Sequence, residues 1–167
     1  MEKFLVPDRM FDTVFEITPD FLKAHGVFAL LCDIDNTLSP YEDAVPDAAV
    51  CNWIAKMRES GVEIALISNN SEARVATYNK DLHLAAFADA HKPSVTVYRQ
   101  ASAALGVPLK KCAVLGDQLL TDALAAWRLK IPAFIVPPIK DKTTLFFRAK
   151  RAVEVPFIRA YKRQNQR

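Results

Sequence analysis

LLCDIDNTLSP, residues 30–40, joins an apolar run to two closely spaced carboxylates. Residues 27–33 are almost entirely apolar, which is typical of a central parallel strand covered on both faces. Asp33 and Asp35 then follow with only Ile34 between them. Two like charges this close repel, so both stay ionised only beside a cation or strong hydrogen-bond donors. The stretch therefore predicts a buried strand that leads directly into a charged site.

The rest of the chain alternates between strand and helix patterns. Strands are expected at residues 27–33, 62–67, 86–88, 111–116 and 133–136, and helices at 47–60, 71–80, 93–105 and 119–130. Ser71 is expected to cap the second of these helices and Gly106 to end the third. Such alternation predicts an α/β, Rossmann-like fold, a parallel sheet with helices on both faces.

Two segments flank this core. Residues 8–25 are expected to be a helical approach, interrupted at Thr18-Pro19. Residues 140–167 carry nine Lys or Arg and two Asp or Glu, whereas residues 1–139 carry 13 and 17, so a basic tail follows an acidic body. We expect one domain over residues 1–139 and a separate helical tail, with a short basic and apolar helix at residues 143–155.

Composition restricts the class of protein. At 167 residues and 51% hydrophobic, the chain fits one globular domain with an ordinary core. Cys32, Cys51 and Cys112 lie in apolar surroundings without C-x-x-C spacing, so we expect buried thiols in a reducing compartment. The N-terminus lacks a signal-peptide pattern, and the longest apolar stretch, residues 26–32, is far shorter than the roughly 18 residues of a membrane span. A cytoplasmic protein, at most peripheral to the inner face of a membrane, is expected.

Polar residues follow four of the predicted strands. In an open parallel sheet, ligands bind beyond the carboxyl ends of the strands. At those ends stand Asp33 to Thr37 after the first strand, Ser68-Asn69 after the second, Lys92 after the third, and Asp117 after the fourth with Asp122 further along. All four ends carry groups that suit a phosphate and a hard cation.

These groups indicate phosphoryl chemistry. Oxygen ligands from Asp33, Asp117 and a backbone carbonyl suit Mg²⁺. One carboxylate can attack phosphorus and form an aspartyl-phosphate, while the other protonates the leaving oxygen and then activates water. Ser68 and Lys92 would hold the phosphoryl oxygens. A Mg²⁺-dependent phosphomonoesterase is the function that this pattern favours.

The same residues carry a family resemblance. DIDNT, the Ser in ISNN, the Lys in HKPS and the Asp residues in GDQLLTD resemble, in order, the four motifs of the haloacid dehalogenase (HAD) superfamily of phosphatases, across residues 27–136. With ITPDFLKAHGV before the first strand, the chain most resembles the YqeG-like group of subfamily IIIA, which is related to mitochondrial phosphatidylglycerophosphatase. The sequence departs from that group at Ala125, Ala126 and Trp127, where Gly and Asn would be expected, outside the catalytic set.

The resemblance implies a role for each motif residue. It makes Asp33 the nucleophile and a metal ligand, Asp35 the general acid/base and a ligand through its backbone carbonyl, Asp117 a metal ligand, Ser68, Asn69 and Lys92 phosphate-binding residues, and Thr37 a support for the first loop. Asp122 would bind the metal through water or support its ligands. Mg²⁺ is the implied cofactor.

The gaps between motifs leave no room for an inserted cap domain. About ten residues separate Thr37 from the helix expected at residue 47, and residues 68–92 already hold a helix and a strand. Even small domains usually need about 40 residues or more. A capless site accepts a phosphate that projects from something large, such as a lipid headgroup, a nucleic acid end or a protein, unless another subunit covers it.

The sequence is compatible with three functions. The resemblance and the basic tail favour phosphatidylglycerol phosphate as substrate, with the tail on an anionic membrane surface. The alternatives are a soluble phosphatase of sugar or nucleotide phosphates that is closed by oligomerisation, and a non-catalytic phosphate-binding scaffold. The tail could equally pack on the domain or contact RNA, although nucleic acid is not the favoured partner.

Overall fold

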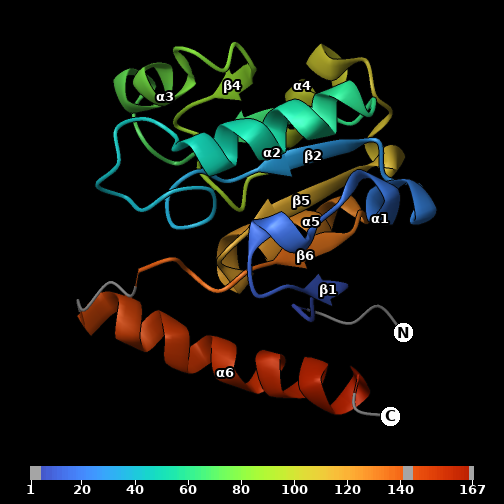
Figure 1. Ribbon diagram of the computed structural model, residues 1–167. Coiled ribbons are helices and arrows are strands. Elements are labelled where there is room, and N and C mark those ends of the chain that lie inside the picture. Colours follow the sequence, from blue (N-terminus) through green and yellow to red (C-terminus); the bar gives the residue numbers. More distant parts are fainter. Residues whose placement is uncertain (1–4, 141–144, 166–167) are drawn as a thin grey trace.

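Six parallel strands form one sheet in the computed structural model, which describes residues 5–140 and 145–165 (Figure 1). The sheet order is β1-β6-β5-β2-β3-β4. The strands are β1 (Arg9–Met10), β2 (Ala29–Cys32), β3 (Glu63–Ile67), β4 (Ala85–Phe87), β5 (Cys112–Gly116) and β6 (Ala133–Ile135). This arrangement confirms the predicted α/β class, and it brings the carboxyl ends of β2, β3 and β5 to one edge.

Strand β2 lies at the centre of the sheet. Leu31 pairs with Ala65 of β3 on one side and with Val114 of β5 on the other. All four residues of β2 are fully buried. The continuous apolar run in the sequence therefore reflects a strand with neighbours on both edges and side chains packed on both faces.

Helices cover both faces of the sheet (Figure 1). They are α1 (Pro19–Ala24), α2 (Ala48–Glu59), α3 (Glu72–Asn79), α4 (Thr96–Leu105), α5 (Leu124–Leu129) and α6 (Leu145–Asn165), with short turns η1 (Val14–Glu16), η2 (Leu109–Lys111) and η3 (Leu119–Ala123, a π-helical turn). Leu30 of β2 packs in a core with α1, α2 and α3, whereas Leu31 packs in a second core with α4 and α5. Alternate residues of one strand thus serve two cores.

Capping residues fix where the helices next to the site begin. Asp47 accepts a hydrogen bond from the Val50 N–H at 2.8 Å, and Ser71 accepts one from the Arg74 N–H at 3.4 Å. The Ser71 cap was predicted and is confirmed. The helix predicted to begin at Pro93 instead begins at Thr96, because the preceding residues form a turn that belongs to the site.

The N-terminal approach is less helical than predicted. Within residues 8–25, η1 and α1 are helical, but Arg9–Met10 forms an edge strand parallel to β6. The Asp8 carboxylate also accepts a hydrogen bond from the Ala133 N–H at 2.8 Å. The open edge of β6 supplies the partner for this strand, and a two-residue strand leaves no periodic pattern in the sequence.

The tail helix is longer than predicted. Helix α6 continues past Pro156 to Asn165, whereas a helix over residues 143–155 was expected; its predicted start and the side chains of residues 141–151 lie outside what the structure describes. Phe157 and Ile158 pack against the second core, and the Tyr161 hydroxyl accepts a hydrogen bond from the Met10 N–H at 3.0 Å. These contacts hold the helix beyond the proline, which on its own weakens a helix interior.

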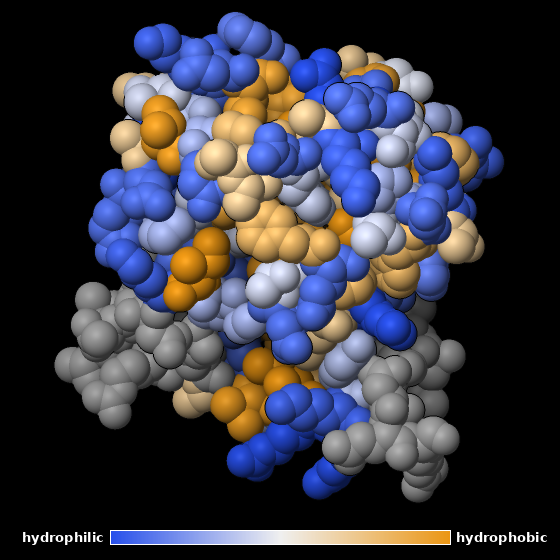
Figure 2. Space-filling model, viewed as in Figure 1, coloured by the Kyte–Doolittle hydropathy of each residue, from blue (hydrophilic) through white to orange (hydrophobic). Residues whose placement is uncertain are grey.

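Helix α6 has a mixed surface. Figure 2 shows apolar groups among hydrophilic ones along the part of this face where α6 lies, and Val153 is 52% exposed. Among the described residues, no helix combines the length and the apolar character needed to cross a membrane.

Candidate active site

The first loop of the site begins where β2 ends. The Asp33 N–H donates to the Leu115 carbonyl at 2.8 Å, so the pairing between β2 and β5 fixes the backbone of Asp33. Asn36 then adopts φ 67°, a left-handed conformation that Asn tolerates better than most residues. The turn brings Thr37 back over the strand, and its hydroxyl donates to Asp33 Oδ2 at 3.0 Å.

Lys92 enters the site from the segment after β4. Its Nζ lies 2.5 Å from Asp33 Oδ1 and 2.8 Å from Asp122 Oδ1, and its side chain is only 4% exposed. Asn69 positions the loop, because its Oδ1 accepts the Lys92 N–H at 2.7 Å. One buried ammonium therefore joins carboxylates that are 89 residues apart in the chain.

Three carboxylates converge at this point. Oxygens of Asp33, Asp117 and Asp122 lie within 4.8 Å of one another, and all three residues are buried. When all three carboxylates are ionised, Lys92 offsets one of the three negative charges. Three buried carboxylates around one short gap suit a divalent cation, which prefers oxygen ligands and would compensate the remaining charge.

Gly116 allows Asp122 to reach this cluster. A Cβ at position 116 would overlap the carboxyl group of Asp122. Asp122 lies in η3, and its Oδ2 accepts the Gln118 N–H at 3.3 Å. The glycine in the sequence GDQLLTD is therefore required by close packing rather than by a positive φ.

Gly116→Ala should displace the Asp122 carboxylate and lower both stability and cation affinity. Overpacking of this kind costs about 1–3 kcal/mol. Chemical denaturation and calorimetric titration with MgCl₂ would measure the two effects. Gly61→Ala is the control for cation affinity: its positive φ makes the substitution lower stability too, but the added methyl group meets no neighbouring atom, so affinity should be kept. Equal cation affinity in the two variants would contradict the packing argument.

Burial and mutual repulsion perturb the acidic groups. Burial raises the pKa of Asp33, although Lys92 opposes this shift. Burial, with the charges of Asp33 and Asp122, raises the pKa of Asp117 to about 8. Burial lowers the pKa of Lys92, but Asp122 and Asp33 outweigh it and hold that pKa well above its ordinary value. Lys92 is therefore charged at neutral pH, whereas Asp117 retains a proton unless a cation displaces it.

Cation affinity is consequently expected to rise with pH. Below pH 8 a cation must displace the Asp117 proton, so the apparent Kd for Mg²⁺ should fall by up to about tenfold per pH unit from pH 6 to pH 8 and then level off. The stability of the cation-free protein should change in the opposite direction. The unfolded chain releases the Asp117 proton near pH 3.8 and the folded chain near pH 8, so the free energy of unfolding falls as the pH rises between these values. Calorimetric titration at four pH values checks the first expectation, and a Kd independent of pH would refute it.

The Asp35 side chain lies apart from the three carboxylates. Its Oδ1 accepts from Arg74 Nη2 at 3.0 Å, and its Oδ2 accepts from Asn70 Nδ2 at 3.4 Å. Arg74 also donates to the Ala44 carbonyl at 2.9 Å and stacks over Tyr78. The Asp35 side chain is 15% exposed, so it is less deeply buried than Asp33 and Asp122.

Ser68 and Asn69 lie at the end of β3, as predicted. Ser68 is buried, and its Oγ accepts the Asn70 N–H at 3.0 Å. Asn69 is exposed and holds the backbone of Lys92. In the structure both residues shape the loops around the carboxylates.

Sequence reasoning missed three residues of this region. Arg74 could have been suspected, since the first turn of a helix that follows a strand end lies beside the site. Tyr98 of α4 is buried near Lys92, and burial together with Asp122 raises its pKa well above the ordinary value. Glu154 of α6 accepts the Leu119 N–H at 3.0 Å. Tyr98 and Glu154 reach the site only through tertiary packing, which leaves no local signal.

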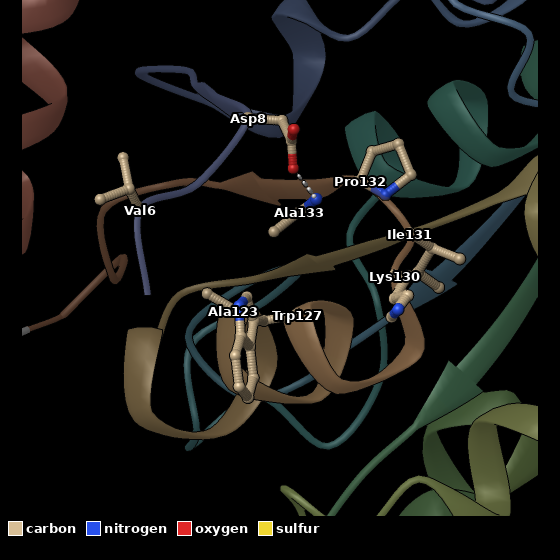
Figure 3. A pocket seen from close by; sticks show the side chains of 8 residues that line it. All are labelled: Val6, Asp8, Ala123, Trp127, Lys130, Ile131, Pro132 and Ala133. Atoms are coloured by element: carbon tan, nitrogen blue, oxygen red, sulfur yellow. Dashed lines mark hydrogen bonds between the residues drawn. The ribbon is translucent and has the colours of Figure 1, made fainter. Parts of the chain in front are cut away.

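Among the hollows that described residues line outside the carboxylate cluster, two adjoin strand β6 or the segment that follows it. One, of about 330 Å³, is bounded by Asp8, Trp127 and Lys130 at the amino end of β6, away from the edge that carries the carboxylates (Figure 3). The other, of about 490 Å³, adjoins Thr37 and is lined largely by apolar residues: Val14, Phe15, Leu38, Val50, Val136 and Ile139. Thr37 and Leu38, which line the second hollow, belong to the loop that begins at Asp33.

Two sequence comparisons with known proteins point to the same kind of enzyme, a hydrolase. Residues 90–138 match a family described as HAD-hydrolase-like. The chain is 31% identical over 164 residues to "Probable phosphatase YqeG" of Bacillus subtilis, covering 98% of this chain and 95% of that protein. The matched portion therefore includes both terminal segments as well as the sheet.

Solved structures share the fold at low identity. The cobalt-bound deoxy-D-mannose-octulosonate 8-phosphate phosphatase of Haemophilus influenzae superposes with a TM-score of 0.56 at 14% identity, over 84% of this chain and 92% of that one. A putative 3-deoxy-D-manno-octulosonate 8-phosphate phosphatase of Vibrio cholerae gives 0.54 at 16% identity, over 86% and 90%. At such identities the likeness establishes the fold alone.

Proposed function

Because the chain belongs to the HAD superfamily of phosphatases and to its YqeG-like group, we propose that it is a Mg²⁺-dependent phosphomonoester hydrolase in which Asp33 is the nucleophile. The observation that carries this proposal is the buried cluster of Asp33, Asp117, Asp122 and Lys92. An ammonium in contact with the nucleophile and two further carboxylates beside it suit a phosphoryl group and a cation together.

The first step forms a covalent intermediate. An Asp33 oxygen attacks phosphorus, an Oδ–P bond forms, and the bond from phosphorus to the leaving oxygen breaks. Lys92 favours the ionised form of Asp33 and lies where negative charge builds up on the phosphoryl oxygens. Thr37 holds the other Asp33 oxygen, which fixes the direction of attack.

Asp35 is the proposed general acid and base. It gives a proton to the leaving oxygen and then takes one from the water that hydrolyses the aspartyl-phosphate. Arg74 and Asn70 hold its carboxylate in the structure, and a change of rotamer would turn it toward the leaving group. Ser68 and Asn69 are proposed to bind phosphoryl oxygens at the end of β3.

The proposed cation ligands are carboxylates of Asp33 and Asp117, with the backbone carbonyl of Asp35; Asp122 supports them directly or through water. When bound, Mg²⁺ supplies positive charge that lowers the energy of the transferring phosphoryl group. The buried carboxylates fit that ion because hard oxygen ligands are its preferred partners.

Phosphatidylglycerol phosphate is the proposed substrate. The loop between β2 and α2, residues 33–47, contains no cap domain, so a phosphate projecting from a bilayer could reach Asp33. The apolar hollow beside Thr37 could take part of the lipid, and exposed Phe15 and Ile139 lie on its wall. Cytoplasmic placement, with peripheral contact between the basic tail and an anionic inner membrane face, belongs to the same proposal.

A substrate screen tests this assignment. Phosphate release would be measured with phosphatidylglycerol phosphate vesicles, sugar phosphates, nucleotides and phosphorylated RNA ends, each compared with the Asp33→Asn variant as background. A lipid phosphatase should prefer the vesicles by tenfold or more in kcat/KM, roughly 1.4 kcal/mol in transition-state binding. Preference for a sugar phosphate or a nucleotide would reject the lipid while retaining the hydrolase.

A phosphatase of small phosphates closed by a second copy is the alternative. Four large apolar side chains near the site are exposed: Phe15, Tyr41, Val45 and Ile139. A second subunit on this surface would cover the open site. Light scattering after size-exclusion chromatography measures the molar mass in solution. A monomer would reject this alternative, because a monomer has no second subunit to cover the site.

A further inference from the structure

Helix α6 contributes a buried carboxylate to the neighbourhood of the site. Glu154 is 5% exposed, in a helix whose described neighbours Val153 and Val155 are 52% and 39% exposed. Its Oε1 accepts the Leu119 N–H at 3.0 Å and the Leu120 N–H at 3.3 Å. Burial of a carboxylate is costly unless it accepts such bonds, so these two hydrogen bonds offset the cost of burying Glu154.

The two N–H groups belong to the segment that carries the carboxylate cluster. Leu119 and Leu120 begin η3, and they stand between Asp117 and Asp122 in the chain. The first N–H groups of a helical segment have no partner within it, and a negative group placed there is favourable. Glu154 therefore satisfies donors in the segment that joins the two cation-site carboxylates.

Other contacts of α6 are made with parts of the domain outside η3. Tyr161 binds the Met10 N–H on β1, at the edge of the sheet. Phe157 and Ile158 pack against the second core. Anchoring of the helix and contact with η3 are thus separate interactions that can be removed one at a time.

We propose that Glu154 is a positioning residue for the cation site, through which the C-terminal helix holds Asp117 and Asp122 in their binding arrangement. The inference rests on the cation site of the proposed function. It assigns the tail a role in building the site, in addition to any contact with a membrane. A partner that pulled α6 away would loosen the segment from Leu119 to Asp122 and weaken cation binding.

Calorimetric titration of the full chain with MgCl₂, without substrate, tests this role. Glu154→Ala removes both hydrogen bonds and should weaken Mg²⁺ binding by about 10–100-fold, the usual effect of losing a group that orients metal ligands. Glu154→Gln keeps an acceptor oxygen and should restore binding to within about threefold of the wild type. Glu154→Asp is a milder change that shortens the side chain, and its Mg²⁺ affinity should lie between those of Glu154→Ala and Glu154→Gln.

Tyr161→Phe is the matched control. It loosens α6 at β1 but leaves Glu154 in place, so its Mg²⁺ affinity should equal that of the wild type. If Glu154→Ala and Glu154→Asp bind Mg²⁺ as the wild type does, or if Tyr161→Phe loses as much affinity as Glu154→Ala, the proposal is wrong. Should Glu154→Ala fail to fold, the Mg²⁺ affinities of Glu154→Asp and Tyr161→Phe are compared instead, and only Glu154→Asp should bind more weakly than the wild type. Wild-type protein that binds Mg²⁺ yet releases no phosphate would overturn the proposed function and leave this inference standing.

Discussion

Asp33→Asn should abolish phosphate release from an aryl phosphate, by about 10³-fold or more, because loss of a catalytic nucleophile leaves only binding and charge stabilisation. An amide at this position cannot form the acyl-phosphate bond that the mechanism requires. The variant should still fold, since Lys92 keeps Asp122 as a partner and Thr37 can donate to the amide oxygen. Release of phosphate from a chromogenic substrate and thermal unfolding measure the two outcomes.

The same experiment separates catalysis from binding. A non-catalytic phosphate-binding scaffold would release no phosphate even as the wild type, so turnover by the wild type excludes that alternative. EDTA should also silence the wild type, and added Mg²⁺ should restore it. Full activity of Asp33→Asn would show that another group attacks phosphorus.

Lys92→Met should destabilise the metal-free protein by about 3–5 kcal/mol at pH 8, because breaking a buried ion pair leaves the carboxylates without their counter-charge. The ammonium contacts both Asp33 and Asp122, and methionine fills similar space without a charge. Turnover should be lost as well. Chemical denaturation in EDTA measures the change in stability.

The loss should depend on pH in a defined direction. Without the ammonium, burial raises the pKa of Asp33 unopposed by Lys92, so the destabilisation caused by Lys92→Met should shrink as the pH falls from 8 to 5. In the wild type Lys92 stays charged over this range because its pKa is raised. Lys110→Met, at an exposed lysine, is the control and should change stability little at either pH. A destabilisation of equal size at both pH values would mean that Lys92 acts by packing rather than by charge.

The sheet and the family were predictable from the sequence because their signals are local. The apolar run through Leu31 marks a central strand, and the motif residues that follow each strand meet at one edge through the geometry of parallel sheets. The family resemblance read from those motifs is confirmed by a relative that matches along nearly the whole chain. The clustering of Asp33, Lys92 and Asp117 follows from the same topology.

What the sequence could not predict depends on contacts between distant segments. Edge strand β1 exists because β6 offers an unpaired edge, and the continuation of α6 past Pro156 depends on packing against the second core. The orientation of Asp35 depends on Arg74, 39 residues away. Such partners have no fixed spacing, so no periodicity reveals them.

The position of Glu154 has a consequence for how the protein is made. Synthesis proceeds from the N-terminus, and early segments fold while later ones are still being added. Every strand of the sheet and the carboxylates of the cluster precede α6 in the chain. If Glu154 positions the cation site, a nascent chain that already has its sheet would still bind Mg²⁺ more weakly than the complete chain. Full hydrolytic activity would then be reached only after translation of the final helix, and a truncated product of interrupted synthesis would need a higher Mg²⁺ concentration than the complete chain.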